Sequence, residues 1–70
     1  MKILDLHGIR HYEVEGKCHL FINDNWGKEM KIITGNSFMM KRLVLDILKF
    51  YKLDFVLDNP YNLGYIIVRK

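Results

Sequence analysis

The sequence predicts an α/β fold, a two-layer β-α-β-α-β-β sandwich in which a four-stranded mixed sheet carries two helices on one face. Two observations predict it. Apolar residues recur at helical spacing over two segments, and shorter runs with the length and composition of strands precede, separate and follow these segments. A chain of 70 residues has room for one core, so we expect a single domain over residues 1–70.

The first strand is expected over residues 2–7, and Gly8 ends it, because glycine accepts the backbone angles of a turn. Side chains alternate between the two faces of a strand. Asp5 and His7 therefore share a face with Ile3, while the neighbouring leucines point to the other face. Two titratable side chains on one face, at the carboxyl end of a strand, are candidates for a functional site.

The first helix is expected over residues 12–23, followed by a stop at residues 25–27. Its apolar stripe consists of Val14, Cys18, Phe21 and Ile22. Cys18 is expected to be a small core residue. Trp26 is expected to pack against the end of this helix.

The second helix has the strongest periodic signal in the chain. Ser37 is a good N-cap residue for its start. The apolar stripe then runs through Met40, Leu43, Val44, Ile47, Leu48 and Tyr51. Met39 and Met40 are expected to make the first core contacts of this helix.

Three further strands are expected over residues 30–34, 54–58 and 65–69, with a turn over residues 59–64. Each β-α-β crossover is right-handed in ~98% of cases, so the first three strands progress in one direction across the sheet. The last strand is the most apolar, which favours a central position and the order 1-2-4-3. The first strand is then an edge strand, and the face that carries Asp5 and His7 is open to solvent.

Charge and composition restrict the classes of partner. The net charge of +3 supports an affinity for polyanions without establishing one. The single Cys18 excludes an internal disulfide and indicates a reducing compartment. No apolar run approaches the ~18 residues of a membrane span, so we expect a cytoplasmic protein, a monomer, that has no membrane partner.

The histidines do not predict a metal site. His7, His11 and His19 are not spaced as a set of metal ligands, so no metal residue and no cofactor are predicted, and a divalent metal has no support from ligand spacing. We expect His11 and His19 to be solvated or capping residues.

The first two strands are expected to end at the same edge of the sheet, where open α/β folds usually bind ligands. There His7 and Gly8 would meet the segment that leads into the second helix, formed by Thr34, Gly35, Asn36 and Ser37. A helix N-terminus suits a phosphate, and Lys41 and Arg42 follow in the first turns. We therefore predict that these six residues of the loop and helix bind phosphate or nucleic acid.

Three motifs together resemble the Smr (small MutS-related) domain family. They are LDLHG at residues 4–8, IITGNS at residues 32–37 before a helix, and GYIIVRK at residues 64–70. The resemblance covers essentially the whole chain, and LDLHG is its most specific part. It implies a fold like the C-terminal domain of bacterial translation initiation factor three, binding to DNA or RNA and, in many members, endonuclease activity.

By this resemblance, Asp5 and His7 are the candidate catalytic residues, with His7 as general acid or base and Asp5 orienting its imidazole. The second loop of the family usually reads HGxG, with a TGxG variant, whereas this chain has TGNS. Thr34 therefore replaces a histidine, and Ser37 replaces a glycine. Binding survives these changes more easily than catalysis does, so we expect a nucleic-acid-binding domain that is a candidate DNA or RNA endonuclease.

Simpler interpretations stay open. His7 is also consistent with a surface histidine bonded to Asp5 or to the backbone, and a turn with a helix cap fully explains Gly35 and Ser37. The alternative function is a non-catalytic protein-interaction or adaptor module. It would use the open face of the sheet, including Tyr65, Ile67 and the edge of the first strand.

Overall fold

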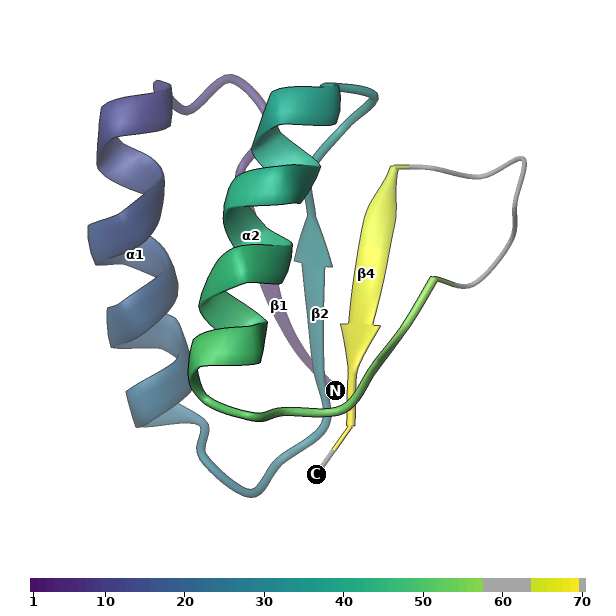
Figure 1. The fold of residues 1–70 in the computed structure, drawn as a ribbon. Helices are drawn as coiled ribbons and strands as arrows, with labels where there is room; N and C mark the ends of the chain where they lie inside the picture. Colours follow the sequence, from purple (N-terminus) through teal and green to yellow (C-terminus); the bar gives the residue numbers. More distant parts are fainter. Residues whose placement is uncertain (58–63, 70) are drawn as a thin grey trace.

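The structure, a computed structural model, describes residues 1–57 and 64–69 of the chain (Figure 1). Its elements are β1 (Lys2–Asp5), α1 (His11–Asp24), β2 (Met30–Ile33), α2 (Phe38–Phe50), β3 (Phe55–Val56) and β4 (Tyr65–Val68). The predicted β-α-β-α-β-β order is confirmed.

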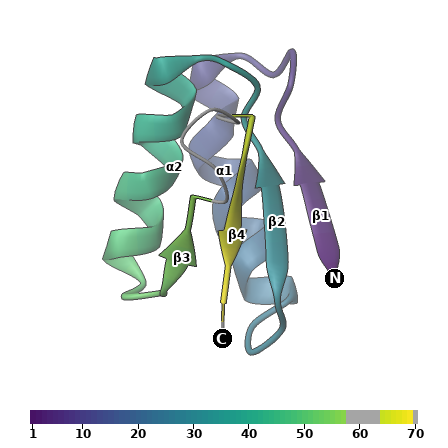
Figure 2. The same cartoon turned by 90° about the vertical axis from the view of Figure 1, so that its right-hand side faces the viewer.

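The sheet has the predicted strand order, β1-β2-β4-β3 (Figure 2). β1 and β2 run parallel, with Ile3 opposite Lys31, and β4 is antiparallel to both β2 and β3. Both helices lie on the same side of the sheet, as Figure 1 and Figure 2 show. The other face, which carries the exposed side chains of Ile3 and Asp5, is open to solvent, and His7 is exposed in the turn after β1.

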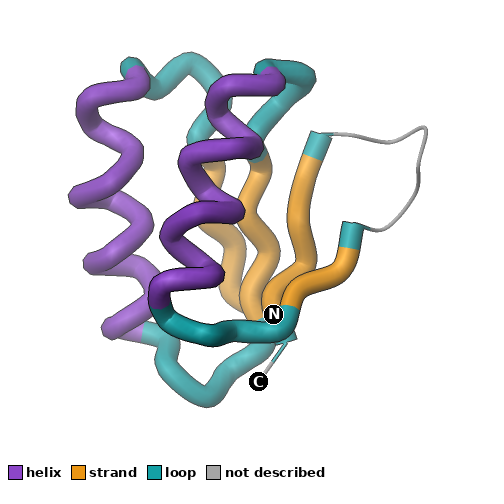
Figure 3. Tube along the Cα trace, in the orientation of Figure 1, coloured by secondary structure: helices purple, strands orange, loops and turns teal. Residues whose placement is uncertain are grey.

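The core lies between the helix layer and the sheet, the two layers drawn in purple and orange in Figure 3. Both predicted stripes contribute to it, and so do alternate residues of the central strands. The buried apolar residues are Leu6, Val14, Cys18, Ile22, Met30, Ile32, Met40, Val44, Leu48, Ile66 and Val68. Burial of this apolar surface is the main favourable term in folding a domain of this size.

Local sequence explains where the helices begin and end. The Ser37 side chain accepts a hydrogen bond from the backbone N–H of Met40 at 3.1 Å, which is the predicted N-cap of α2. Asn25 is the C-cap of α1, and its backbone N–H donates to Phe21 O at 3.1 Å. Gly27 then turns the chain toward β2 with a φ of 80°, in the left-handed region that favours glycine.

All four strands are shorter than predicted, the second and fourth by one residue and the first and third by more. β1 ends at Asp5 because the chain turns there: the Ile9 N–H donates to Leu6 O at 3.0 Å, with Gly8 at a φ of 80° in the turn. β3 covers only Phe55–Val56 of the predicted 54–58. Residue 58 and most of the turn expected over 59–64 lie outside the described residues.

Two packing predictions are wrong or incomplete. Met39 is 52% exposed, because it falls on the solvent side of α2 while Met40 turns to the sheet. Trp26 contacts Tyr51, with ring centroids 5.9 Å apart, yet it stays 55% exposed. Within the described residues, neither helix combines the length and apolar character needed to cross a membrane.

Burial raises the pKa of the Cys18 thiol from 9.0 to about 11. A group with a raised folded-state pKa stabilises the fold at low pH, and this contribution is lost as the pH rises through the folded value. We therefore expect the free energy of unfolding to decrease between about pH 9 and pH 11 through this thiol. Urea unfolding at about pH 8 and about pH 10.5 measures the decrease. The Cys18→Ala variant should show a smaller decrease, and an equal one would contradict the assignment.

Candidate nucleic-acid interface

The parallel pairing of β1 with β2 brings two loops to one edge of the sheet. Asp5 is opposite Ile33, and one residue further the backbone N–H of Leu6 donates to Ile33 O at 2.8 Å. Beyond this bond, the His7 ring lies beside Gly35: its Cδ2 atom is 3.5 Å from the position that a Cβ on Gly35 would occupy. The LDLHG and TGNS segments therefore meet, as expected from the sequence.

The loop before α2 is held by the start of β4. The backbone N–H groups of Thr34 and Gly35 both donate to Gly64 O, at 2.8 and 3.0 Å. Gly35 has a φ of 68°, which L side chains rarely adopt. This conformation turns the chain from β2 toward the first residue of α2, and it leaves the backbone of Gly35 next to the imidazole.

Thr34 is turned inward. Its side chain is 3% exposed, and its hydroxyl donates to the carbonyl oxygen of Gly35 at 3.0 Å. In this position Thr34 cannot present its hydroxyl to a ligand as a surface histidine would present its ring. Its contribution to the loop is structural, and a phosphate contact from this segment would come from other residues.

The first turn of α2 offers free donors. Ser37 uses its side-chain oxygen to cap Met40, so that group is already occupied. The N–H groups of Phe38 and Met39 precede the first intrahelical bond, and none of the described residues accepts a hydrogen bond from them. Such donors, together with the positive end of the helix dipole, favour an anion at this place.

Asp5 does not orient the imidazole, which corrects the expectation from the sequence. Its Oδ1 atom accepts a hydrogen bond from the backbone N–H of His7 at 2.9 Å. The two residues are two apart, and at that separation a carboxylate reaches the backbone more easily than the ring. Within residues 1–57 and 64–69, no group hydrogen-bonds to the exposed His7 ring. Asp5 therefore positions the turn that carries His7.

Lys41 and Arg42 lie away from the imidazole. They line a pocket of about 370 Å³ on the flank of α2, next to Leu57, which directly follows β3. β3 is the edge strand opposite β1, so this pocket faces the other edge of the sheet. The structure thus divides the predicted site into two parts: the imidazole beside the loop, and the cations on the flank of α2.

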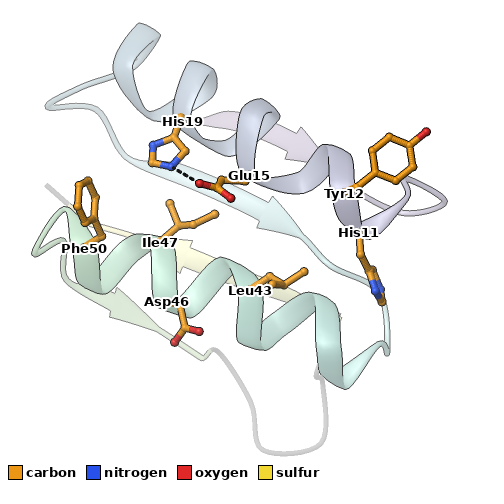
Figure 4. A pocket seen from close by; sticks show the side chains of 8 residues that line it. All are labelled: His11, Tyr12, Glu15, His19, Leu43, Asp46, Ile47 and Phe50. Carbon is orange, nitrogen blue, oxygen red and sulfur yellow. Dashed lines mark ion pairs between the residues drawn. The ribbon is translucent and has the colours of Figure 1, made fainter.

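A second pocket, of about 450 Å³, lies between α1 and α2 (Figure 4). Its residues are His11, Tyr12, Glu15, His19, Leu43, Asp46, Ile47 and Phe50. His19 Nδ1 hydrogen-bonds to the Tyr51 hydroxyl, and His19 Nε2 lies 3.8 Å from Glu15 Oε1. We expected a solvated or capping His19 and missed this contact, although the i, i+4 spacing of Glu15 and His19 is a signal for their pairing.

The described residues contain no group of three or more His, Cys, Asp or Glu side chains arranged to hold a metal ion. No family model, no curated protein and no solved structure matches the chain. The resemblance to the Smr family therefore stays a prediction from the sequence motifs alone.

Because Gly35 has a positive φ and Gly16 lies in a helix, replacement by alanine should change the stability of the fold in opposite directions at these two positions. Gly35→Ala places a Cβ in the left-handed region and should destabilise the fold by about 1–2 kcal/mol. Gly16→Ala lies in the interior of α1, with nothing within 4 Å of the new Cβ, and should stabilise the fold by up to about 1 kcal/mol. Urea unfolding of both variants measures the difference, and shifts of equal sign would contradict the loop geometry.

Proposed function

We propose that the protein binds nucleic acid at the edge of the sheet where β1 and β2 end and α2 begins. One observation carries the proposal: the exposed His7 ring lies against Gly35, in the loop that leads into the free N–H groups at the start of α2. An imidazole beside backbone donors at a helix N-terminus suits a phosphate of a nucleic-acid backbone. The resemblance to the Smr family supports the same function.

The charged residues extend this surface along α2. A backbone phosphate at the start of the helix would have the next phosphates near Lys41 and Arg42, on the side of β3. Lysine and arginine side chains supply much of the affinity for a phosphate backbone, whatever the base sequence. Since the loop and the cations lie on different sides of α2, the ligand must be long enough to cross the start of α2 from the side of β1 to the side of β3.

The stronger form of the proposal adds cleavage of a phosphodiester bond. His7 would act as general base toward the water or ribose hydroxyl that attacks the phosphate, or as general acid toward the oxygen that leaves. Asp5 would hold the turn that presents His7, through the bond to the His7 N–H. Thr34 is buried and takes no part in proton transfer in this scheme. The scheme therefore depends on one imidazole where the related family usually has two histidines in these motifs.

Binding is expected to weaken steeply with salt, because phosphate contacts release counterions. Fluorescence anisotropy with a labelled oligonucleotide at several salt concentrations measures the slope. Replacing Lys41 and Arg42 together by alanine should weaken binding and flatten the slope of log K against log [salt] by about 2. The matched control replaces the exposed Lys17 and Lys28, which carry the same charge away from the start of α2. An affinity that changes neither with salt concentration nor on replacement of Lys41 and Arg42 would contradict the proposal.

Cleavage, where it occurs, is expected to depend on His7. Removal of a general acid or base typically lowers the rate by about 10²–10⁴-fold, so His7→Ala should lose nearly all cleavage of single- and double-stranded DNA and RNA. The control His11→Ala removes another exposed histidine at the start of α1 and should keep it. Equal cleavage by wild type and His7→Ala would assign the activity to a contaminant.

A protein-interaction module is the second candidate function. Ile3 is 57% exposed on the edge strand β1 and pairs with Lys31 on β2, which in turn pairs with the half-buried Ile67 on β4. Lys31 Nζ lies 4.2 Å from the centre of the Tyr65 ring on this face. An apolar open face beside an edge strand can add a partner strand or a partner surface. A folded protein that lacks affinity for nucleic acid at low salt, yet forms a stable complex with another protein, would favour this function.

A further inference from the structure

Phe38 is an exposed aromatic residue at the first position of α2, with 80% of its surface accessible. A single exposed apolar residue is ordinary in a small protein. The surroundings of Phe38 are more informative. It lines the pocket of about 370 Å³ on the flank of α2, together with the apolar residues Leu45 and Leu57.

The described residues that line this pocket carry a net positive charge. Lys41, Arg42 and Lys49 line it, against the single carboxylate of Asp46. Among the described residues, none of these four side chains has an ion-pair partner within 4.0 Å. The three cations are therefore available to an external anion, and the described residues of the pocket combine a net positive charge with an exposed aromatic ring.

The helix places the ring and the charges on one face. Lys41 and Arg42 follow Phe38 by three and four residues, which is the spacing of neighbours on a helix surface. Phe38 also directly follows the cap residue Ser37 and contributes one of the free N–H groups at the start of α2. A ligand bound by that N–H group is therefore next to the aromatic ring of the same residue.

We propose that Phe38 is a stacking platform for an unpaired base, so that the ligand of this surface is single-stranded nucleic acid. The inference rests on the proposed nucleic-acid function and specifies its substrate class. Alternating phosphates and bases match a groove that combines cations with an aromatic ring, as in proteins that bind single strands. In a duplex, the faces of the bases are already stacked, and only the phosphates would remain for Lys41, Arg42 and Lys49.

Other anionic ligands fit this surface less well. An acidic peptide would satisfy the three cations, but it has no flat group that must lie on the Phe38 ring. A duplex would contact the cations, and the ring would contribute nothing to its affinity. Single-stranded nucleic acid is therefore the ligand that can contact both the cations and the aromatic ring of the pocket.

The test compares Phe38→Ala with Phe50→Ala, measured by anisotropy with a single-stranded oligonucleotide and with the matching duplex. Phe50 lies on the same helix and is 73% exposed, but it lines the pocket between α1 and α2 (Figure 4). We expect Phe38→Ala to weaken single-strand binding by about tenfold or more and to leave duplex binding unchanged. Phe50→Ala should leave both unchanged, and Phe38→Trp should keep single-strand binding.

The outcomes separate this inference from the proposed function. If wild type binds neither ligand, the proposed function is wrong and the inference is lost with it. Wild type that binds with the expected salt dependence would support nucleic-acid binding. If Phe38→Ala then keeps the affinity of wild type, or loses affinity for the single strand and the duplex equally, the stacking platform is wrong. Binding of an acidic peptide that is as tight as that of the single strand and unaffected by Phe38→Ala would also overturn it.

Discussion

The parallel pairing of β1 with β2 is the interaction on which the candidate site depends. Among the described residues, the bond from the Leu6 N–H to Ile33 O is the last backbone hydrogen bond between the two segments before they turn in different directions. Beneath it, Leu6 and Ile32 are fully buried in the core, so the end of β1 is held by packing as well as by hydrogen bonds. Without this pairing, nothing would keep the His7 ring beside Gly35.

The architecture followed from the pattern of apolar residues, because that pattern records burial directly. The stripe through Val44 and Leu48 identified the second helix, and both residues are fully buried under it. The central position of β4 followed from its apolar run together with the handedness of crossover connections, and Ile66 and Val68 are likewise fully buried. These inferences succeeded because each rests on many side chains that must all be removed from water.

The roles of single polar side chains could not be predicted in the same way, because each depends on its partners in space. The carboxylate of Asp5 binds a backbone N–H two residues away, and the hydroxyl of Thr34 turns inward to the loop. Lys41 was expected in the same phosphate site as the loop before the helix, but the structure places it in the pocket on the side of β3. A sequence gives the spacing of such residues along a helix, whereas the packed core decides which neighbour each of them faces.

The central claim is that phosphate binds where His7 meets the start of α2. Backbone amide chemical shifts, followed by NMR while a short single-stranded oligonucleotide is added, test it most directly. The account predicts that the largest changes fall on His7, Gly35 and the first turn of α2, at Phe38 and Met39. Changes confined to the open face of the sheet, around Ile3 and Ile67, or an absence of changes at low salt, would contradict it.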